Sequence, residues 1–369
     1  MKHKNIPDHW RKKMKKKRNN LLPFKQKNKY LKDRTAPWKI QGILFFASMI
    51  TIILIIPTLI VVPFVADNEQ HNADESESGQ VDISLGDSPF SVAVMRASSE
   101  KVENVPLETY VARVVASEMP AEFELEALKA QSLAARTFIV NHMVSQESPG
   151  KSDVTDTVSD QVYHSKQELR DLLEDDFKWK MEKVKKAVKA TKGQILTYND
   201  TPITASFFST SNGYTENSED YWKNKVPYLR SVKSPWDKGS PKFLDQKIFT
   251  IAKVEDALGV KLPNSGNINM KITRTEGERV DQLKISGKKL SGRTVRQELE
   301  LQSSDFTIEQ KNDHLIFTTQ GFGHGVGMSQ YGANGMAKQG KSYKQIVKHY
   351  YQGVEISSIN QTAPTLVAK

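Results

Sequence analysis

The segment PLETYVARVVASEMPAEFELEALKAQSLAARTFIVNHM, from Pro106 to Met143, predicts two helices joined at an acidic corner. Pro106 suits the first helical position, where its missing N–H would have no partner in any case. Pro120 ends this helix, because the residue before a proline is pushed out of the α region. Apolar residues recur between them at the spacing of a core-facing stripe, at Leu107, Val111, Val114 and Val115.

The second helix resumes near Glu124 and places Leu128, Ala135, Phe138, Ile139 and His142 on one broad face. Glu118 follows the last turn of the first helix, where its carboxylate faces the negative end of the helix dipole beside apolar neighbours. Both influences disfavour the ionised form and raise the pKa of Glu118, which suits a general acid at neutral pH. Local sequence alone favours the alternative of a solvated corner glutamate.

The charge of the chain is concentrated at one end. Of a formal net charge of +10 over 369 residues, residues 1–39 carry fifteen Lys and Arg and only two Asp, so the rest is mildly acidic. The folded part therefore shows no basic footprint for nucleic acid. The absence of cysteine excludes disulfides, thiolate catalysis and cysteine-based zinc sites.

A membrane anchor is the clearest feature of the N-terminal part. Residues 40–66 are uncharged and apolar over a length that suffices for a spanning helix, longer than the apolar region of a cleaved signal peptide. The basic tail, 1–39, then stays in the cytoplasm, and its run Arg11–Arg18 suits anionic lipid better than nucleic acid. We expect a single-pass membrane protein with a linker at 67–88, an extracytoplasmic body at 89–358 and a short C-terminal tail at 359–369.

The body is expected to be a single α+β unit, because helical and strand patterns alternate without a regular βαβ rhythm. A charged helical stretch at 165–190 precedes a hairpin whose strands, 194–198 and 203–209, meet across Asn199-Asp200. A short helix is predicted at 249–258 and others at 292–299 and 343–350. Strands are predicted at 90–95, 268–272, 282–285, 306–310, 315–319 and 354–356.

Nucleotide and metal chemistry find little support. The glycines at 321, 323, 325 and 327 alternate, unlike a dinucleotide-binding fingerprint, and there is no Walker lysine or H-E-x-x-H motif. Asp153, Asp156, Asp160 and His164 are close enough in sequence to suggest a metal site, but a solvated polar loop is favoured. We therefore expect no metal and no cofactor.

Two polar loops are candidate ligand sites. Ser209 or Ser211 could pair with His324 as a nucleophile, but neither serine sits in a G-x-S-x-G elbow, so their loop, STSNG, is better interpreted as donors for a polar ligand. The loop from Gly321 is either a tight turn that needs positive φ or a close backbone approach to substrate. Four alternating glycines favour the second interpretation, with side-chain contacts from His324, Gln330 and Tyr331.

Arg136 lies within the apolar segment AQSLAARTFIV, and a buried arginine needs a charge partner. Glu118 at the hinge of the same helical pair is the partner that would complete a site. The alternative is a structural salt bridge to Glu122, Glu124 or Glu126. An acid, an arginine and two polar loops together would form a polyol-binding cleft with one catalytic carboxylate.

At these residues the chain resembles the SpoIID family, over roughly Phe90 to Ile356. The resemblance is carried by VVASEMP with EALKAQSLAARTF, by FFSTSNGYTENSEDYW with YLRSV, and by GFGHGVGMSQYGA. It implies a lytic transglycosylase that cleaves peptidoglycan glycan strands between N-acetylmuramic acid and N-acetylglucosamine, with Glu118 as the catalytic residue. The substrate-binding residues are then expected to be Arg136, Gln131, Ser209, Ser211, His324, Gln330 and Tyr331.

The resemblance also implies a setting, namely the engulfing membrane of a sporulating cell. The implied partners are stage II sporulation protein P, an amidase/endopeptidase that strips stem peptides first, and stage II sporulation protein M in the membrane. Some members bind zinc through a cysteine before Gln-Val-Tyr and neighbouring histidines. Here Asp160 takes that place before Gln161, so a structural zinc is not expected.

The expected mechanism needs one carboxylate. Protonated Glu118 donates to the glycosidic oxygen, and its carboxylate then accepts the proton of the muramic acid 6-hydroxyl as a 1,6-anhydro ring closes. Ordinary glycoside hydrolysis uses two carboxylates, so a water-using muramidase with Glu216 or Asp220 as the second is an alternative. Another is a non-catalytic wall-binding protein that activates a partner amidase.

Overall fold

The computed structural model describes residues 85, 88–145, 150–157, 160–263 and 266–367, which all belong to one compact unit, Gly79–Lys369. The predicted basic tail and the predicted span at 40–66 lie outside these residues. Within them, no helix is both long enough and apolar enough to cross a membrane. The mixture of helices and several small sheets confirms the α+β class.

The first half of the described chain is mainly helical. Its elements are, in order, β1 (Ser91–Arg96), β2 (Lys101–Pro106), α2 (Leu107–Glu118), α3 (Leu125–Ser145), β3 (Val154–Thr155), α4 (Lys166–Leu173), η1 (Glu174–Asp176), α5 (Phe177–Ala190), β4 (Gln194–Tyr198), β5 (Thr201–Pro202), β6 (Phe207–Phe208), α6 (Ser218–Trp222) and η2 (Pro235–Gly239).

The second half begins with strands and ends with helices. Its elements are β7 (Leu244–Thr250), α7 (Ile251–Leu258), β8 (Met270–Arg274), β9 (Val280–Ile285), β10 (Lys288–Ser291), α8 (Gly292–Glu298), β11 (Phe306–Lys311), β12 (His314–Gln320), β13 (Met328–Ser329), α9 (Gln330–Lys338), α10 (Tyr343–Tyr350), β14 (Glu355–Ser358), α11 (Ile359–Thr362) and α12 (Pro364–Val367).

The predicted helical pair is α2 and α3. All four residues of the predicted stripe on α2 are fully buried, and the chain is extended at Met119, immediately before Pro120. Pro106, expected as the first helical residue, instead ends β2 and caps α2, so the helix starts one residue later. The short corner between the helices leaves Glu118 as the last residue of α2.

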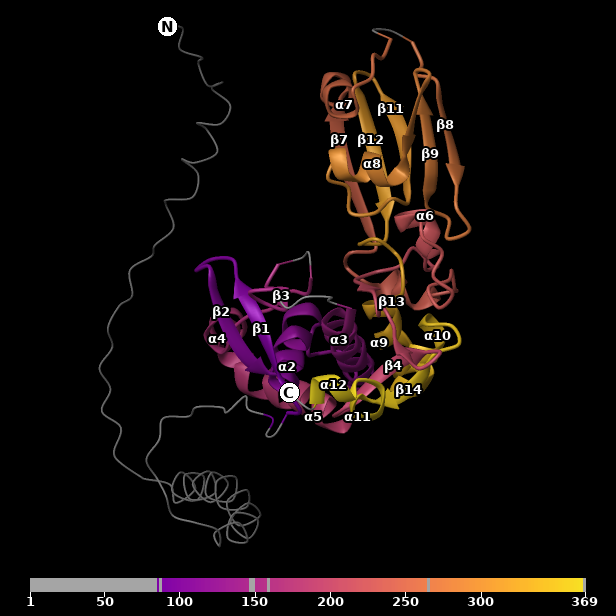
Figure 1. Cartoon of the computed structure of the whole chain (residues 1–369). Coiled ribbons are helices and arrows are strands. Elements are labelled where there is room, and N and C mark those ends of the chain that lie inside the picture. Colours follow the sequence, from indigo (N-terminus) through magenta and orange to yellow (C-terminus); the bar gives the residue numbers. More distant parts are fainter. Residues whose placement is uncertain (1–84, 86–87, 146–149, 158–159, 264–265, 368–369) are drawn as a thin grey trace, which may run out of the picture. The chain divides into compact units, whose positions relative to one another are not determined.

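Helix α3 runs through the main core and is buried over more than the one broad face that the sequence predicted, since polar residues such as Gln131 and Arg136 are buried as well. It packs against α2, α5, β4, α9 and α10. Figure 1 shows the yellow helices α9 and α10 beside the purple α3, although they are far apart in sequence. The C-terminal part of the chain therefore completes the core that the helical pair begins.

A buried ion pair links α2 and α3. The Arg136 guanidinium donates to both carboxylate oxygens of Glu108, at 3.1 and 2.6 Å, and both side chains are at most 1% exposed. Arg136 also donates to the carbonyl oxygen of Gln194 at 3.2 Å, and Glu108 accepts the amide of Gly193 at 3.1 Å. The pair thus fastens both helices to the start of strand β4.

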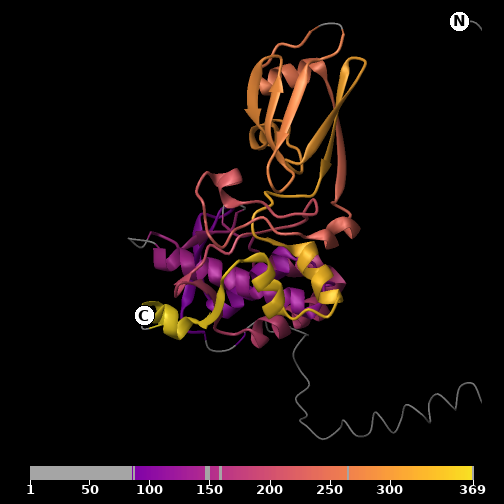
Figure 2. The same cartoon turned by 90° about the vertical axis from the view of Figure 1, so that its right-hand side faces the viewer.

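A second hydrophobic cluster is formed by residues 254–317. Here the sheet β11-β12-β7 and the sheet β10-β9-β8 share a core with α7 and α8. Figure 2 shows these orange strands grouped at one end of the folded unit, apart from the purple and yellow helices. The chain leaves the main core after the hydroxyl-rich loop, Ser209–Gly213, and returns to it through the glycine loop, Gly321–Gly327.

Most predicted elements are confirmed, but several of their boundaries are corrected by the structure. The stretch 165–190 is two helices, because Glu174 adopts a φ of +46° between α4 and α5. Phe249 belongs to strand β7, which was not predicted, and the helix begins at Ile251. The turn at Asn199-Asp200 is confirmed, since both residues have positive φ and Tyr198 pairs with Thr201. The second strand, predicted at 203–209, is wrong: β4 pairs across this turn with Thr201–Pro202, whereas Phe207–Phe208 form β6 and pair with β13.

We predict that Glu108→Gln lowers the free energy of unfolding by roughly 3–5 kcal/mol, because it leaves the Arg136 charge buried without a counter-ion. The matched control is Glu103→Gln. Glu103 pairs with Arg113 at 2.6 Å but is 35% exposed, so its loss should cost about 1 kcal/mol or less. Urea unfolding of both variants measures the difference, and equal destabilisation would contradict this ranking.

Candidate active site

A cavity of about 590 Å³ brings together the sequence elements that were selected for chemistry. Its walls come from the end of α2, the segment 160–162, β6, the glycine loop and the start of α9. Among the residues that line it are five predicted site residues, Glu118, Ser209, His324, Gln330 and Tyr331.

Glu118 sits in a partly buried position on this wall. Burial raises the pKa of its carboxyl, and the Val162 amide, which donates to Oε1 at 2.8 Å, opposes that rise in part. The raised pKa agrees with the prediction, and its main cause is burial among the cavity walls. The same hydrogen bond fixes the orientation of the carboxyl group toward the segment 160–162.

The two polar loops lie against each other. Thr210 and Phe322 exchange backbone hydrogen bonds at 3.1 and 2.7 Å, and strand β6 pairs in parallel with β13. Ser209 therefore lines the cavity, as expected. Ser211 does not: it is fully buried and donates to Asp237 at 2.8 Å, so its predicted contact with substrate is wrong.

The glycine loop needs its glycines for the protein's own packing. Gly325 has φ +87°, and a Cβ there would lie 2.3 Å from the guanidinium carbon of Arg279. Gly327 has φ +83°, and its Cβ would lie 2.0 Å from the Ser206 carbonyl oxygen. Of the four, only Gly323 lines the cavity. The interpretation of all four as a close approach to substrate is therefore wrong.

His324 is neutral and holds the loop together. Burial lowers the pKa of its imidazole to about 4, and the positive charges of Arg296 and Arg279 act in the same direction. Its Nδ1 accepts the Val326 amide at 3.0 Å, which assigns the proton to Nε2. His324 therefore contributes a ring to the cavity wall, packed among Phe208, Tyr221 and Trp222.

Gln330 and Tyr331 occupy the opposite wall at the start of α9. Tyr331 packs edge-on against Phe123, with ring centroids 4.8 Å apart, which ties the cavity to the corner of the helical pair. Gln330 is 6% exposed, and its Nε2 has no hydrogen-bond partner among the described residues. A buried donor without a partner is costly, so Gln330 is well suited to meet an acceptor oxygen of a ligand.

Two predicted substrate contacts are wrong because their side chains lie in the core. Arg136 has Glu108 as its partner, not Glu118 and not any of the three glutamates of the alternative, and it is fully buried. Gln131 is also fully buried and does not line the cavity. Sequence could show that Arg136 needs a carboxylate, but Glu108 lies on the same helix as Glu118, so sequence position did not discriminate between them.

The second carboxylate that lines the cavity is Asp160, and not Glu216 or Asp220, the two that the sequence suggested. Glu216 is 2% exposed, its carboxylate lies 3.8 Å from the Arg279 guanidinium, and burial raises its pKa to about 7. Neither Glu216 nor Asp220 lines the cavity, whereas Asp160 does. Asp160 accepts both the amide and the hydroxyl of Thr155 at 2.8 Å through one oxygen. Its proximity to Glu118 is a result of folding.

The acidic residues near Asp160 are engaged by the protein. Asp153 accepts the Ala93 amide at 2.7 Å, Asp156 pairs with Arg96 at 3.2 Å, and His164 Nδ1 lies 2.9 Å from the Ser117 hydroxyl. Among the residues with described positions, no group of three or more His, Cys, Asp or Glu is arranged to hold a metal ion.

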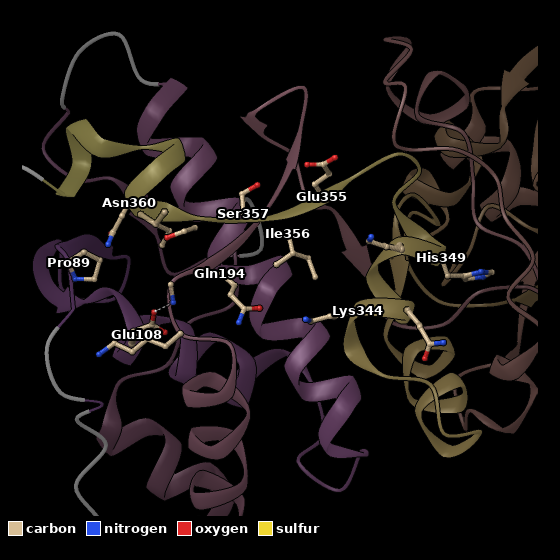
Figure 3. Close-up of a pocket in the computed structure, with 15 residues that line it drawn as sticks. Pro89, Glu108, Gln194, Lys344, His349, Glu355, Ile356, Ser357 and Asn360 are labelled. Atoms are coloured by element: carbon tan, nitrogen blue, oxygen red, sulfur yellow. Dashed lines mark hydrogen bonds between the residues drawn. The ribbon is translucent and has the colours of Figure 1, made fainter.

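A larger hollow, of about 1340 Å³, lies elsewhere on the unit and contains none of the predicted site residues. Figure 3 shows Lys344 and His349 on one side of it and Pro89 and Glu108 on the other, with β14 between. Glu108 is committed to Arg136, so it is not free for chemistry. The cavity at Glu118 is therefore the candidate active site because of the residues that line it, although the other hollow is larger.

Comparison with known proteins gives matches that span most of the chain. A family model described as "SpoIID: Stage II sporulation protein" matches residues 95–198. Stage II sporulation protein D of Bacillus subtilis (strain 168) is 51% identical over 86% of this chain and 96% of its own length. The protein of the same name from Bacillus amyloliquefaciens is 48% identical over 89% and 98%. An "Amidase enhancer" of Bacillus subtilis is 29% identical over 66% of this chain and 40% of its own length.

We predict that Gly325→Ala lowers the free energy of unfolding by roughly 3 kcal/mol or more, because the new methyl group overlaps the buried Arg279 guanidinium. Gly340→Ala is the matched control. Gly340 has a similar φ of +79° but no atom within 4 Å of the added Cβ, so only the backbone strain of about 1 kcal/mol should remain. Thermal unfolding of the two variants tests the difference, and equal losses would show that the contact with Arg279 is unimportant.

Proposed function

This chain belongs to the SpoIID family of stage II sporulation proteins, and on that basis we propose that it is a lytic transglycosylase of peptidoglycan. The proposed reaction cleaves glycan strands between N-acetylmuramic acid and N-acetylglucosamine and leaves a 1,6-anhydro end. The observation that carries the proposal is Glu118, a carboxyl of raised pKa on the wall of a cavity lined by polar loops.

The chemistry requires a group that gives and then takes a proton. Protonated Glu118 donates to the glycosidic oxygen as the bond from that oxygen to C1 of muramic acid breaks. The 6-hydroxyl oxygen of the same sugar then bonds to C1, and the Glu118 carboxylate accepts the hydroxyl proton. No water is consumed and Glu118 ends protonated, so a single acid with a raised pKa suffices.

The remaining cavity residues have supporting roles in this proposal. Ser209 and Gln330 offer hydrogen bonds to sugar oxygens, and Tyr331 and His324 offer ring surfaces. His324 is neutral near pH 7 because burial lowers its pKa to about 4, so it does not compete with Glu118 as the acid. Protein–sugar contacts of this kind position the scissile bond against the acid.

The proposed setting rests on the apolar segment of the sequence and on what the family resemblance implies. Residues 40–66 would anchor the protein in the membrane with its N-terminus in the cytoplasm and the catalytic unit outside. The proposed substrate is glycan already stripped of stem peptides at the engulfing membrane. The proposed partners are stage II sporulation protein P, which would do the stripping, and stage II sporulation protein M.

Specific observations support two other candidates. Asp160 shares the cavity with Glu118, so a water-using muramidase has a possible second carboxylate. The likeness to a protein named amidase enhancer supports a wall-binding protein that assists an amidase without cutting glycan itself. The products of the reaction separate all three candidates.

We predict that the full chain, purified in detergent, releases anhydro-ended fragments from peptide-free glycan strands, and that Glu118→Gln abolishes this release. Glutamine keeps the acceptor for the Val162 amide but cannot transfer the proton. Loss of a general acid typically costs about 10²–10⁴-fold in rate. Mass spectrometry of the products gives the readout, since anhydro ends are lighter than reducing ends by one water.

The control is Glu124→Gln, a change of an exposed glutamate that does not line the cavity. It should retain wild-type activity. Reducing ends instead of anhydro ends would identify the muramidase and direct attention to Asp160. Strands that stay intact while bound to the wild-type protein would identify the non-catalytic candidate.

We also predict that Glu118→Gln stabilises the protein increasingly as the pH rises. The pKa of Glu118 is raised in the folded state, so the folded protein retains a proton that the unfolded chain has released. Wild-type stability is therefore lost as the pH rises from the unfolded pKa through the folded pKa, whereas glutamine does not titrate. The difference in Tm between the two proteins should be near zero at pH 4 and positive at pH 8. A difference that does not change with pH would contradict the raised pKa.

A further inference from the structure

Glu118 lies where two hollows meet. Beside the cavity of about 590 Å³ is a smaller one of about 270 Å³, lined by residues of α2, α4 and α5 and by the corner after α2. Four residues line both hollows, namely Ser117, Glu118, Pro120 and Lys242. A glycan strand bound across Glu118 would place one sugar in each hollow, so both sides of the scissile bond have a surface.

Lys242 is the basic residue common to the two hollows. Its Nζ lies 4.8 Å from the centroid of the Phe322 ring, a cation–π contact that holds the ammonium group near the glycine loop. None of the ion pairs formed by residues with described positions includes Lys242. Its charge is therefore available to a ligand.

The other lysine of the smaller hollow is not available in this way. Lys180 lies 2.9 Å from Glu122 and 3.1 Å from Asp176, so its charge already has two partners. The other charged residues that line the cavity of about 590 Å³ are Glu118 and Asp160. Burial disfavours the ionised form of Glu118, and Asp160 accepts a hydrogen bond from the Thr155 hydroxyl. Lys242 thus stands beside the catalytic acid as a cation without a committed counter-ion.

The proposed substrate carries a matching anion. The 3-O-lactyl group of muramic acid is an amide while a stem peptide is attached, and it becomes a free carboxylate when the peptide is removed. This carboxylate is the only charged group on a peptide-free strand of alternating N-acetylglucosamine and N-acetylmuramic acid. It is carried by the same sugar whose C1 reacts beside Glu118.

We propose that Lys242 binds the free lactyl carboxylate of muramic acid at the scissile bond and so makes the enzyme selective for peptide-free glycan. This inference rests on the proposed function, because it names the substrate feature that the same site reads. The amide between the lactyl group and the peptide must then be hydrolysed first, because that hydrolysis creates the anion that Lys242 recognises.

The expected size of the effect is modest. Lys242 is exposed in the free protein, where water screens its charge and weakens any ion pair. Sugars bound in the two hollows would exclude part of this water and strengthen the pair. A selectivity of about fivefold to tenfold is therefore expected, between the upper limit for an exposed ion pair and the lower limit for a hydrogen bond to a charged group.

The test compares two substrates that differ only in this charge. Peptide-free glycan strands are used either with the free lactyl carboxylate or after conversion of that group to its neutral methylamide, and kcat/KM is measured for the full chain from the release of anhydro ends. The wild type should prefer the carboxylate about fivefold to tenfold, mainly through KM. Lys242→Met should reduce the ratio to about one, Lys242→Glu should invert it, and Lys242→Arg should retain most of it.

The control is Lys238→Met, which removes an exposed lysine that lines neither hollow and should leave the ratio unchanged. The inference is overturned if the wild type cleaves both substrates equally well, or if Lys242→Met keeps the preference. In either case the anhydro products would still support the proposed function. If the wild type releases no anhydro ends from either substrate, the proposed function fails, and this inference fails with it.

Discussion

The buried pair of Arg136 and Glu108 is the interaction on which the arrangement of the site depends. Helix α3 is surrounded by other elements, so a charge on it must be neutralised inside the core. Glu108 does this from α2, and the backbone at Gly193 and Gln194 completes the network. Because Glu118 ends the same helix that carries Glu108, the ion pair determines where the acid lies relative to the rest of the core.

The opposite wall of the cavity depends on close backbone packing. The glycine loop and the hydroxyl-rich loop bridge to each other at Thr210 and Phe322, and Gly325 lets the buried Arg279 pass beneath the loop. Arg279 immediately precedes strand β9, whose Val280 belongs to the second hydrophobic cluster, and its guanidinium lies 3.8 Å from the Glu216 carboxylate. The residues of 244–320 therefore support the wall through a buried charge pair, although they do not themselves line the cavity.

The electrostatics of the cavity separate the roles of its ionisable groups. Burial raises the pKa of Glu118 and lowers that of His324, so both groups are biased toward their neutral forms. Of these two neutral forms, that of the carboxyl is the one that can act as a general acid. Lys242, at the exposed edge, remains a cation that can meet an anion. A neutral acid beside an available cation suits a substrate that is polar throughout and charged at one point.

The sequence by itself determined the helical pair, its end at Glu118, the α+β class and the polar loops that line the cavity. These follow from local rules: apolar spacing, the effect of Pro120 on the residue before it, and the turn at Asn199-Asp200. The elements that the sequence missed lacked such a signal. Strand β7, for example, exposes Leu244 and Ile248, so its apolar pattern does not mark a buried face.

Only the tertiary structure decided which side chains meet. Arg136 pairs with Glu108 instead of Glu118, and Gln131 and Ser211 are buried. Glu216 lies outside the cavity, whereas Asp160 and Lys242 line it. The physical reason is that contacts between residues far apart in sequence depend on how whole elements pack. Residue type shows that a buried charge needs a partner, whereas the choice among nearby carboxylates is made by the fold.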